Sequence, residues 1–125
     1  MFRFLFCLYL LCSMVISPAF SMGLQKLEVE YHQYPLALDV PSPRFGWQLV
    51  SNPHERGIYQ TAYQLEVKDE AGKVVWNSGK VTTDVSQHVT YQGEALKPAT
   101  RYTWKVKIWN NKGEIAEKDA WFETS

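Results

Sequence analysis

Residues 96–109 read Leu-Lys-Pro-Ala-Thr-Arg-Tyr-Thr-Trp-Lys-Val-Lys-Ile-Trp, and this stretch decides the fold. From Tyr102 to Ile108 apolar and polar side chains alternate, which is typical of a half-buried β-strand. Pro98 cannot donate to a strand ladder, so it marks the turn that leads into this strand. A tyrosine that follows a Leu96-x-Pro98 turn can direct its hydroxyl to upstream backbone, which predicts a structural tyrosine corner at Leu96, Pro98 and Tyr102. The alternative is an ordinary amphipathic strand without a corner.

Six further stretches carry the alternation or the flanking turn signals of short strands. They are Leu24–Tyr31, Phe45–Val50, Ala62–Lys68, Val74–Trp76, His88–Tyr91 and Ala120–Thr124. In the first of them Leu27, Val29 and Tyr31 are expected on the inward side, and Gly72 is expected to supply the positive φ of the turn after the third. Seven short strands without a convincing helix period predict an all-β, seven-stranded antiparallel Greek-key sandwich of the fibronectin type III or immunoglobulin type.

Residues 1–21 have the pattern of a secretory signal peptide. Arg3 is a charged n-region, residues 4–16 are nearly all apolar, and Ala19-Phe20-Ser21 resembles a cleavage site. A transmembrane anchor is the alternative, but the apolar stretch is short for a membrane span. The sequence therefore predicts a signal peptide over 1–21, one sandwich domain over 22–125, and export to the periplasm or the outside of the cell.

Composition and charge exclude several classes of function. The chain of 125 residues is 46% hydrophobic and has thirteen basic and thirteen acidic residues, which suits a globular domain without a nucleic-acid partner or, after signal cleavage, a membrane partner. Cys7 and Cys12 would leave with the signal. The three histidines (His32, His54 and His88) lie in unrelated segments, and the carboxylates fall on outward strand positions or in loops. We therefore predict no catalytic, cofactor-binding or metal-binding residues.

The aromatic residues are the remaining candidates for a site. Trp47, Tyr63, Trp76 and Trp104 are expected in the core, whereas Trp109 shares the outward register of Lys105 and Lys107. Trp109 could stack on a sugar ring, pack on a neighbouring domain, or lie under the turn at 110–113. Trp121 and Phe122 are adjacent in a strand, so one of them should leave the core. Trp109 and Trp121 are thus the predicted contacts for a neighbouring domain or a sugar.

The pattern Leu96-x-Pro98-x-Thr100-x-Tyr102 resembles the fibronectin type III domain. More specifically, residues 22–125 resemble the N-terminal fibronectin-III-like domain of bacterial α-L-rhamnosidases. The matching runs occur in family order at 41–49 (Pro-Ser-Pro-Arg-Phe-Gly-Trp-Gln-Leu), 60–67, 75–81, 101–110 and 120–124.

This resemblance implies a limited role for the chain. In the family, acidic residues of a downstream (α/α)6 barrel hydrolyse terminal α-L-rhamnosyl bonds with inversion, and no position here matches that barrel. The resemblance implies a non-catalytic structural module of a secreted glycosidase, truncated before the catalytic barrel. Its partners would be the neighbouring β-domains and the barrel, with rhamnose-containing glycans reached through the parent enzyme. The alternatives are a free-standing carbohydrate-binding or adhesion module and, from fibronectin-III analogy alone, a receptor-like protein-binding module.

Overall fold

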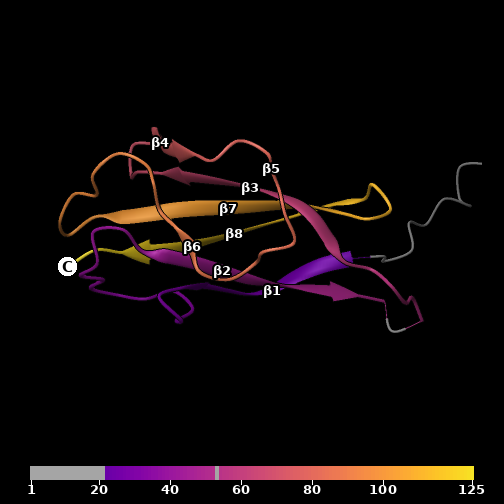
Figure 1. Cartoon of the computed structure of the whole chain (residues 1–125). Coiled ribbons are helices and arrows are strands. Elements are labelled where there is room, and N and C mark those ends of the chain that lie inside the picture. The colour runs from indigo at the N-terminus through magenta and orange to yellow at the C-terminus, as the bar shows by residue number, and fades with distance from the viewer. Residues whose placement is uncertain (1–21, 53) are drawn as a thin grey trace, which may run out of the picture.

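The computed structural model describes residues 22–52 and 54–125, which form two antiparallel sheets packed face to face (Figure 1). One sheet has the order β1 (Met22–Val29), β2 (Arg44–Ser51), β6 (Val89–Thr90). The other has the order β4 (Val74–Asn77), β3 (Gln60–Lys68), β7 (Arg101–Asn110), β8 (Ile115–Glu123), and β5 (Val81–Thr82) also pairs with β3. This order is that of an immunoglobulin-like sandwich, so the predicted all-β antiparallel fold is confirmed.

The core lies between the two sheets and is dominated by β7. Its inward residues Tyr102, Trp104, Val106 and Ile108 are all buried, which confirms the alternation predicted for this strand. Phe45 from the facing sheet lies with its ring centroid 4.8 Å from that of Trp104. Burial of such large rings is the main stabilising contribution in a sandwich of this size.

The structure has eight strands in its described part, one more than predicted, and the last strand is longer than expected. The additional strand β5 pairs with Ala62 and Tyr63 of β3 over two residues only, which is too short for alternation to show in the sequence. Strand β8 begins at Ile115 instead of Ala120 and pairs with β7 residue by residue from there. Its first half contains three consecutive polar residues, Glu117, Lys118 and Asp119, which interrupt the hydrophobic alternation, so the sequence pattern did not reveal it.

Tyr31 does not lie in the core, contrary to the prediction. The first strand ends at Val29, and Glu30 and Tyr31 have positive φ values of 49° and 70°. Val29 and His32 then exchange backbone hydrogen bonds in a tight turn, so the alternation stops two residues early. Tyr31 is 55% exposed as a result.

The predicted signal peptide, with Cys7 and Cys12, lies outside the described residues. Within 22–52 and 54–125, no helix has the length and apolar character needed to span a bilayer. The connection at 30–43, the connection at 91–100 and the C-terminus lie together at one end of the sandwich, and the β7–β8 turn lies at the other (Figure 1).

Candidate interdomain surface

The last residues of the chain hold the long β1–β2 connection in place. Leu38 forms a parallel bridge with Thr124, and its backbone N–H donates to the carbonyl of Glu123 at 2.8 Å. The N–H of Ser125 donates in turn to the carbonyl of Leu38 at 3.0 Å. The connection is therefore fixed beside the point where the last strand leaves the sandwich.

Trp121 lies at this end on the outer face of β8. Its neighbour Phe122 is fully buried, as expected for adjacent residues of a strand, whereas Trp121 is half-buried. The Trp121 ring lies 5.1 Å from the ring of Tyr34 and 4.0 Å from the guanidinium carbon of Arg101. Arg101 is itself held by Glu123, whose carboxylate accepts from Nε at 2.7 Å. The indole is thus fixed between an aromatic ring and a cation on the surface.

Further apolar side chains are exposed on the same connection. Leu36 is 64% exposed, and Tyr34 and Val40 are exposed as well. We call Tyr34, Leu36, Val40 and Trp121 the C-terminal apolar surface. A hollow of about 230 Å³ opens next to Val40 and is also lined by Leu96 and Pro98. Val40 is the residue of this surface that lines the hollow. Exposed aromatic and aliphatic side chains at one end of a domain are typical of a contact surface for protein.

The residues of the predicted tyrosine corner lie beside this hollow. Tyr102 is 2% exposed, and its hydroxyl accepts the backbone N–H of Lys97 at 2.8 Å. Leu96 is half-buried against the core, while Pro98 is exposed. The Thr124 hydroxyl donates to the carbonyl of Lys97 at 2.6 Å, which joins this connection to the last strand.

Trp109 lies on the same outer sheet face but far from Trp121. Trp121 pairs with Thr103, and Trp109 is six residues further along β7, or about 20 Å at the rise of a strand. Trp109 is half-buried, and the ammonium groups of Lys80 and Lys107 lie 4.5 Å and 5.1 Å from its ring centroid. The structure therefore does not bring the two predicted contact residues together. A sugar stacking on Trp109 would compete with these ammonium groups.

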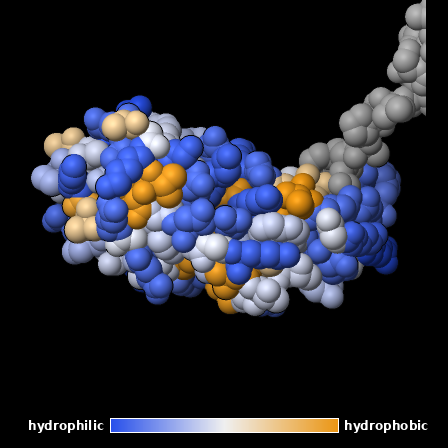
Figure 2. All heavy atoms as spheres, turned by 90° about the horizontal axis from the view of Figure 1, so that it is seen from above, coloured by the Kyte–Doolittle hydropathy of each residue, from blue (hydrophilic) through white to orange (hydrophobic). Residues whose placement is uncertain are grey.

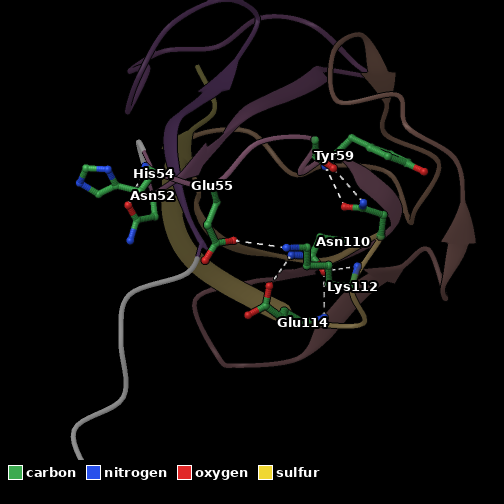
Figure 3. Close-up of polar contacts among 9 residues, drawn as sticks. Asn52, His54, Glu55, Tyr59, Asn110, Lys112 and Glu114 are labelled. Atoms are coloured by element: carbon green, nitrogen blue, oxygen red, sulfur yellow. Dashed lines mark hydrogen bonds and ion pairs between the residues drawn. The ribbon is translucent and has the colours of Figure 1, made fainter.

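A polar network occupies the opposite end of the sandwich (Figure 3). The buried Asn110 side chain accepts the backbone N–H groups of Lys112 and Glu114, both at 2.9 Å, and donates to the Glu114 carboxylate at 2.9 Å. The ammonium of Lys112 lies 3.9 Å from the Glu55 carboxylate. These bonds satisfy the backbone of the β7–β8 turn, so we interpret the network as structural.

The described residues hold no cluster of three or more His, Cys, Asp or Glu side chains that could bind a metal ion.

The carboxylate of Glu30 accepts from the Arg44 guanidinium at 2.9 Å and 3.0 Å. These hydrogen bonds lower the pKa of the Glu30 carboxyl. A carboxylate held ionised in this way suits an ion pair better than a general acid, which needs a raised pKa.

Sequence reasoning missed Gln60, which is only 5% exposed. Its side-chain oxygen accepts the indole N–H of Trp47 at 2.8 Å, and its amide nitrogen donates to the carbonyls of Thr83 and Val85. Simple alternation places Gln60 on the outward face with Ala62. A register irregularity between these two residues breaks that alternation, and no signal in the sequence marks it.

Two facing antiparallel sheets in this order define an immunoglobulin-like β-sandwich domain. Residues 24–125 match the family described as Rha78A-like, N-terminal immunoglobulin domain, and the chain belongs to this family. The resemblance to α-L-rhamnosidases found in the sequence is therefore confirmed.

The relatives are large enzymes of which this domain is a small part. The α-L-rhamnosidase of Streptomyces avermitilis is 44% identical over 102 residues, which are 77% of this chain and 10% of that protein. The crystal structure of the Streptomyces avermitilis α-L-rhamnosidase complexed with L-rhamnose has a TM-score of 0.76 and 38% identity, covering 84% of this chain and 11% of that chain. The structure of the α-L-rhamnosidase from Dictyoglumus thermophilum has a TM-score of 0.73 and 32% identity, and the match covers 82% of this chain and 12% of that chain. The chain thus spans about a tenth of the length of these relatives, whose structures contain other domains.

Proposed function

We propose that this chain is a non-catalytic, exported structural module of an α-L-rhamnosidase, and that it packs on adjoining domains through the C-terminal apolar surface. The parent enzyme would hydrolyse terminal α-L-rhamnosyl bonds. Its other β-domains and its catalytic barrel would be the partners of this module. Family membership supports the parent activity, and the residue pattern of 1–21 supports export.

The observation that carries this proposal is the position of the C-terminal apolar surface. Leu36 and Val40 are exposed on a connection that backbone hydrogen bonds fix to Glu123 and Ser125. A chain that continued after Ser125 would leave the sandwich beside these side chains. Contacts between consecutive domains are favoured there because the linkage makes the association intramolecular.

A chimeric enzyme tests the docking role. Residues 24–125 would replace the matching segment of the Streptomyces avermitilis α-L-rhamnosidase, and we expect the chimera to hydrolyse an aryl α-L-rhamnoside. In the chimera, Leu36→Asp should lower the midpoint of thermal unfolding because it places a charge in the contact. In the chain alone, the same substitution should change the free energy of unfolding by less than about 0.5 kcal/mol.

Ile115→Asp is the matched control, since Ile115 is 52% exposed and lies at the opposite end of the sandwich. It should leave the chimera's thermal midpoint unchanged. Equal effects of Leu36→Asp and Ile115→Asp in the chimera would contradict docking at this surface.

Two simpler measurements test the rest of the proposal. The purified chain should not hydrolyse an aryl α-L-rhamnoside, and turnover would contradict a non-catalytic role. The intact mass of the protein from its source cell, detected with an antibody to this domain, should correspond to a product several times larger that lacks residues 1–21. A product no larger than residues 22–125 would favour a free-standing module instead.

A further inference from the structure

The two long sides of the sandwich differ. On one side, the ammonium of Lys118 in β8 reaches the carbonyl of Leu24 in β1 at 3.4 Å. On the other side, a cavity of about 550 Å³ lies between β4 and β5 of one sheet and β6 of the other. Seen from the β4 side, hydrophobic residues reach the surface as small patches among hydrophilic ones (Figure 2).

The hydroxyl of Tyr63 is an unused polar group at this cavity. Tyr63 lines the cavity although it is only 9% exposed, and its ring lies 5.3 Å from the ring of Trp47. Burial raises the pKa of this phenol. No other described residue forms a hydrogen bond with its hydroxyl, and the hydroxyl is not one of the fully buried unpaired polar atoms of the described residues, so it is accessible from the cavity. The hydroxyl is therefore available to a bound ligand.

Aromatic and aliphatic side chains form the walls of the cavity. The ring of Trp76 is half-buried and is held 5.3 Å from the ring of Tyr91 and 6.0 Å from that of Phe45. Val81 and Val85 also line the cavity. A fixed indole beside aliphatic groups provides a surface on which the C–H face of a sugar ring can pack.

The polar groups at the rim are hydroxyls and amides. Thr90 and Gln92 line the cavity, are exposed, and make no side-chain hydrogen bond to another described residue. No Asp, Glu, Lys or Arg is among the described residues that line it. The one imidazole, of His88, lies 3.0 Å from the hydroxyl of Tyr31. An anionic or cationic ligand would thus lose hydration here without gaining an ion pair.

We propose that this groove is a binding site for a neutral saccharide, one pyranose ring of which packs on Trp76 and hydrogen-bonds to Tyr63 and Gln92. Sugar hydroxyls both donate and accept, which suits a rim of hydroxyl and amide groups. The volume lies within the range of about 300 to 1,000 Å³ found for small-molecule sites. The groove shares no residue with the C-terminal apolar surface, so this inference does not depend on the proposed docking role.

A titration of the full chain tests the proposal directly. Methyl α-L-rhamnopyranoside and methyl α-D-glucopyranoside serve as neutral probes and sodium D-glucuronate as the anionic one, with tryptophan fluorescence and backbone amide shifts as readouts. We expect saturable binding of at least one neutral probe, with shifts at Thr90 and Gln92 and at least tenfold weaker binding of glucuronate. The proposal is overturned if neither neutral probe saturates at tens of millimolar, if glucuronate binds equally well, or if the shifts lie around Trp109.

Substitutions that remove single polar groups locate the site. Tyr63→Phe should raise the Kd about three- to tenfold, the equivalent of one hydrogen bond. It should not lower the urea midpoint, because the lost hydroxyl has no partner among the described residues. Tyr59→Phe is the matched control, since Tyr59 is 57% exposed and does not line the groove. Equal Kd values for these two variants would overturn the assignment of Tyr63.

Gln92→Ala provides a second test at an exposed position, where folding should not be affected. It should also raise the Kd several-fold. Thr103→Val on the outer face of β7 is the control and should leave the Kd unchanged. An unchanged Kd for Gln92→Ala together with an unchanged Kd for Tyr63→Phe would remove the groove as the site.

Discussion

The hydroxyl of Tyr102 accepts the backbone N–H of Lys97 at 2.8 Å, so a residue inside the core holds the connection that precedes its own strand. The ring of Tyr102 also stacks on that of Phe122 at 5.4 Å. The buried ring fixes the hydroxyl, and the hydroxyl fixes the backbone at 97. The hollow beside the C-terminal apolar surface, which Lys97 helps to line, depends on this arrangement.

Tyr102→Phe should destabilise the domain by about 1 to 3 kcal/mol, because it leaves the N–H of Lys97 without its acceptor while the ring packing is retained. Urea denaturation measures the effect. Tyr59→Phe, at an exposed tyrosine, should leave the urea midpoint where it is. If the midpoint of Tyr102→Phe is also unchanged, the hydrogen bond does not stabilise the fold.

Gln60→Met should destabilise the domain by about 2 to 4 kcal/mol, although the two side chains have similar shapes. The substitution leaves the Trp47 indole N–H and the carbonyls of Thr83 and Val85 without their partner. Gln25→Met is the control because Gln25 is exposed and bonds only to Gln48. Similar urea midpoints for the two variants would contradict a structural role for Gln60.

Stability should fall with pH above about 10, the usual pKa of a tyrosine in an unfolded chain. Burial first, then Tyr102 and Glu94, raises the pKa of Tyr91 to about 12 in the folded state. Between these two pKa values the unfolded state releases the tyrosine proton first, so up to about 3 kcal/mol of stability is lost as the pH rises.

Urea denaturation of the wild type and Tyr91→Phe at several alkaline pH values measures this loss. Tyr91→Phe should be less stable at neutral pH, because the Tyr91 hydroxyl donates to the carbonyl of Glu94 at 2.5 Å. The stability of Tyr91→Phe should nevertheless fall less steeply between pH 10 and 12. The fall that remains in this variant is due in part to Tyr63, because burial also raises the pKa of Tyr63. Parallel pH profiles for the two proteins would refute the assignment to Tyr91.

Glu30→Gln should make the free energy of unfolding depend less on pH in the acid range. The pKa of Glu30 is lowered from its ordinary value of 4.5 by hydrogen bonds from Arg44, so the ion pair stabilises the fold above that value. This stabilisation is lost as the pH falls through the lower, folded pKa. Glu117→Gln is the control, since Glu117 lies 3.8 Å from Lys107 in a more exposed pair. Identical acid profiles for wild type and Glu30→Gln would show that this pair does not contribute.

Much of the fold could be predicted from the alternation of apolar and polar residues, because a long strand that is buried on one face shows this pattern in its own sequence. Strand β7 was predicted in this way, and so was the opposite placement of Trp121 and Phe122. Tyr31 was predicted wrongly, since its alternation continues into a turn with positive φ that nothing in the sequence marks. Strand β5 was missed because two residues are too few for a period.

The candidate sites were less accessible to sequence reasoning. Trp109 and Trp121 were predicted to leave the core, and both are half-buried on the outer sheet face. Their separation along this face follows from the register of β7 and β8. The C-terminal apolar surface is formed by residues of the connection at 30–43 and of the last strand. The groove is lined by residues of β3, β4 and β6, among others. Such sites combine segments that are far apart in the sequence, so no local pattern indicates them.

The sequence by itself determined the two-sheet architecture and the family, since both depend on local residue spacing repeated in a series of segments along the chain. Only the tertiary structure decided where strands end, which polar residues are buried, and which side of the sandwich contains the cavity. These features depend on pairing between distant strands. The burial of Gln60 and the exposure of Tyr31 are set by that pairing and not by the hydrophobicity of the residue itself.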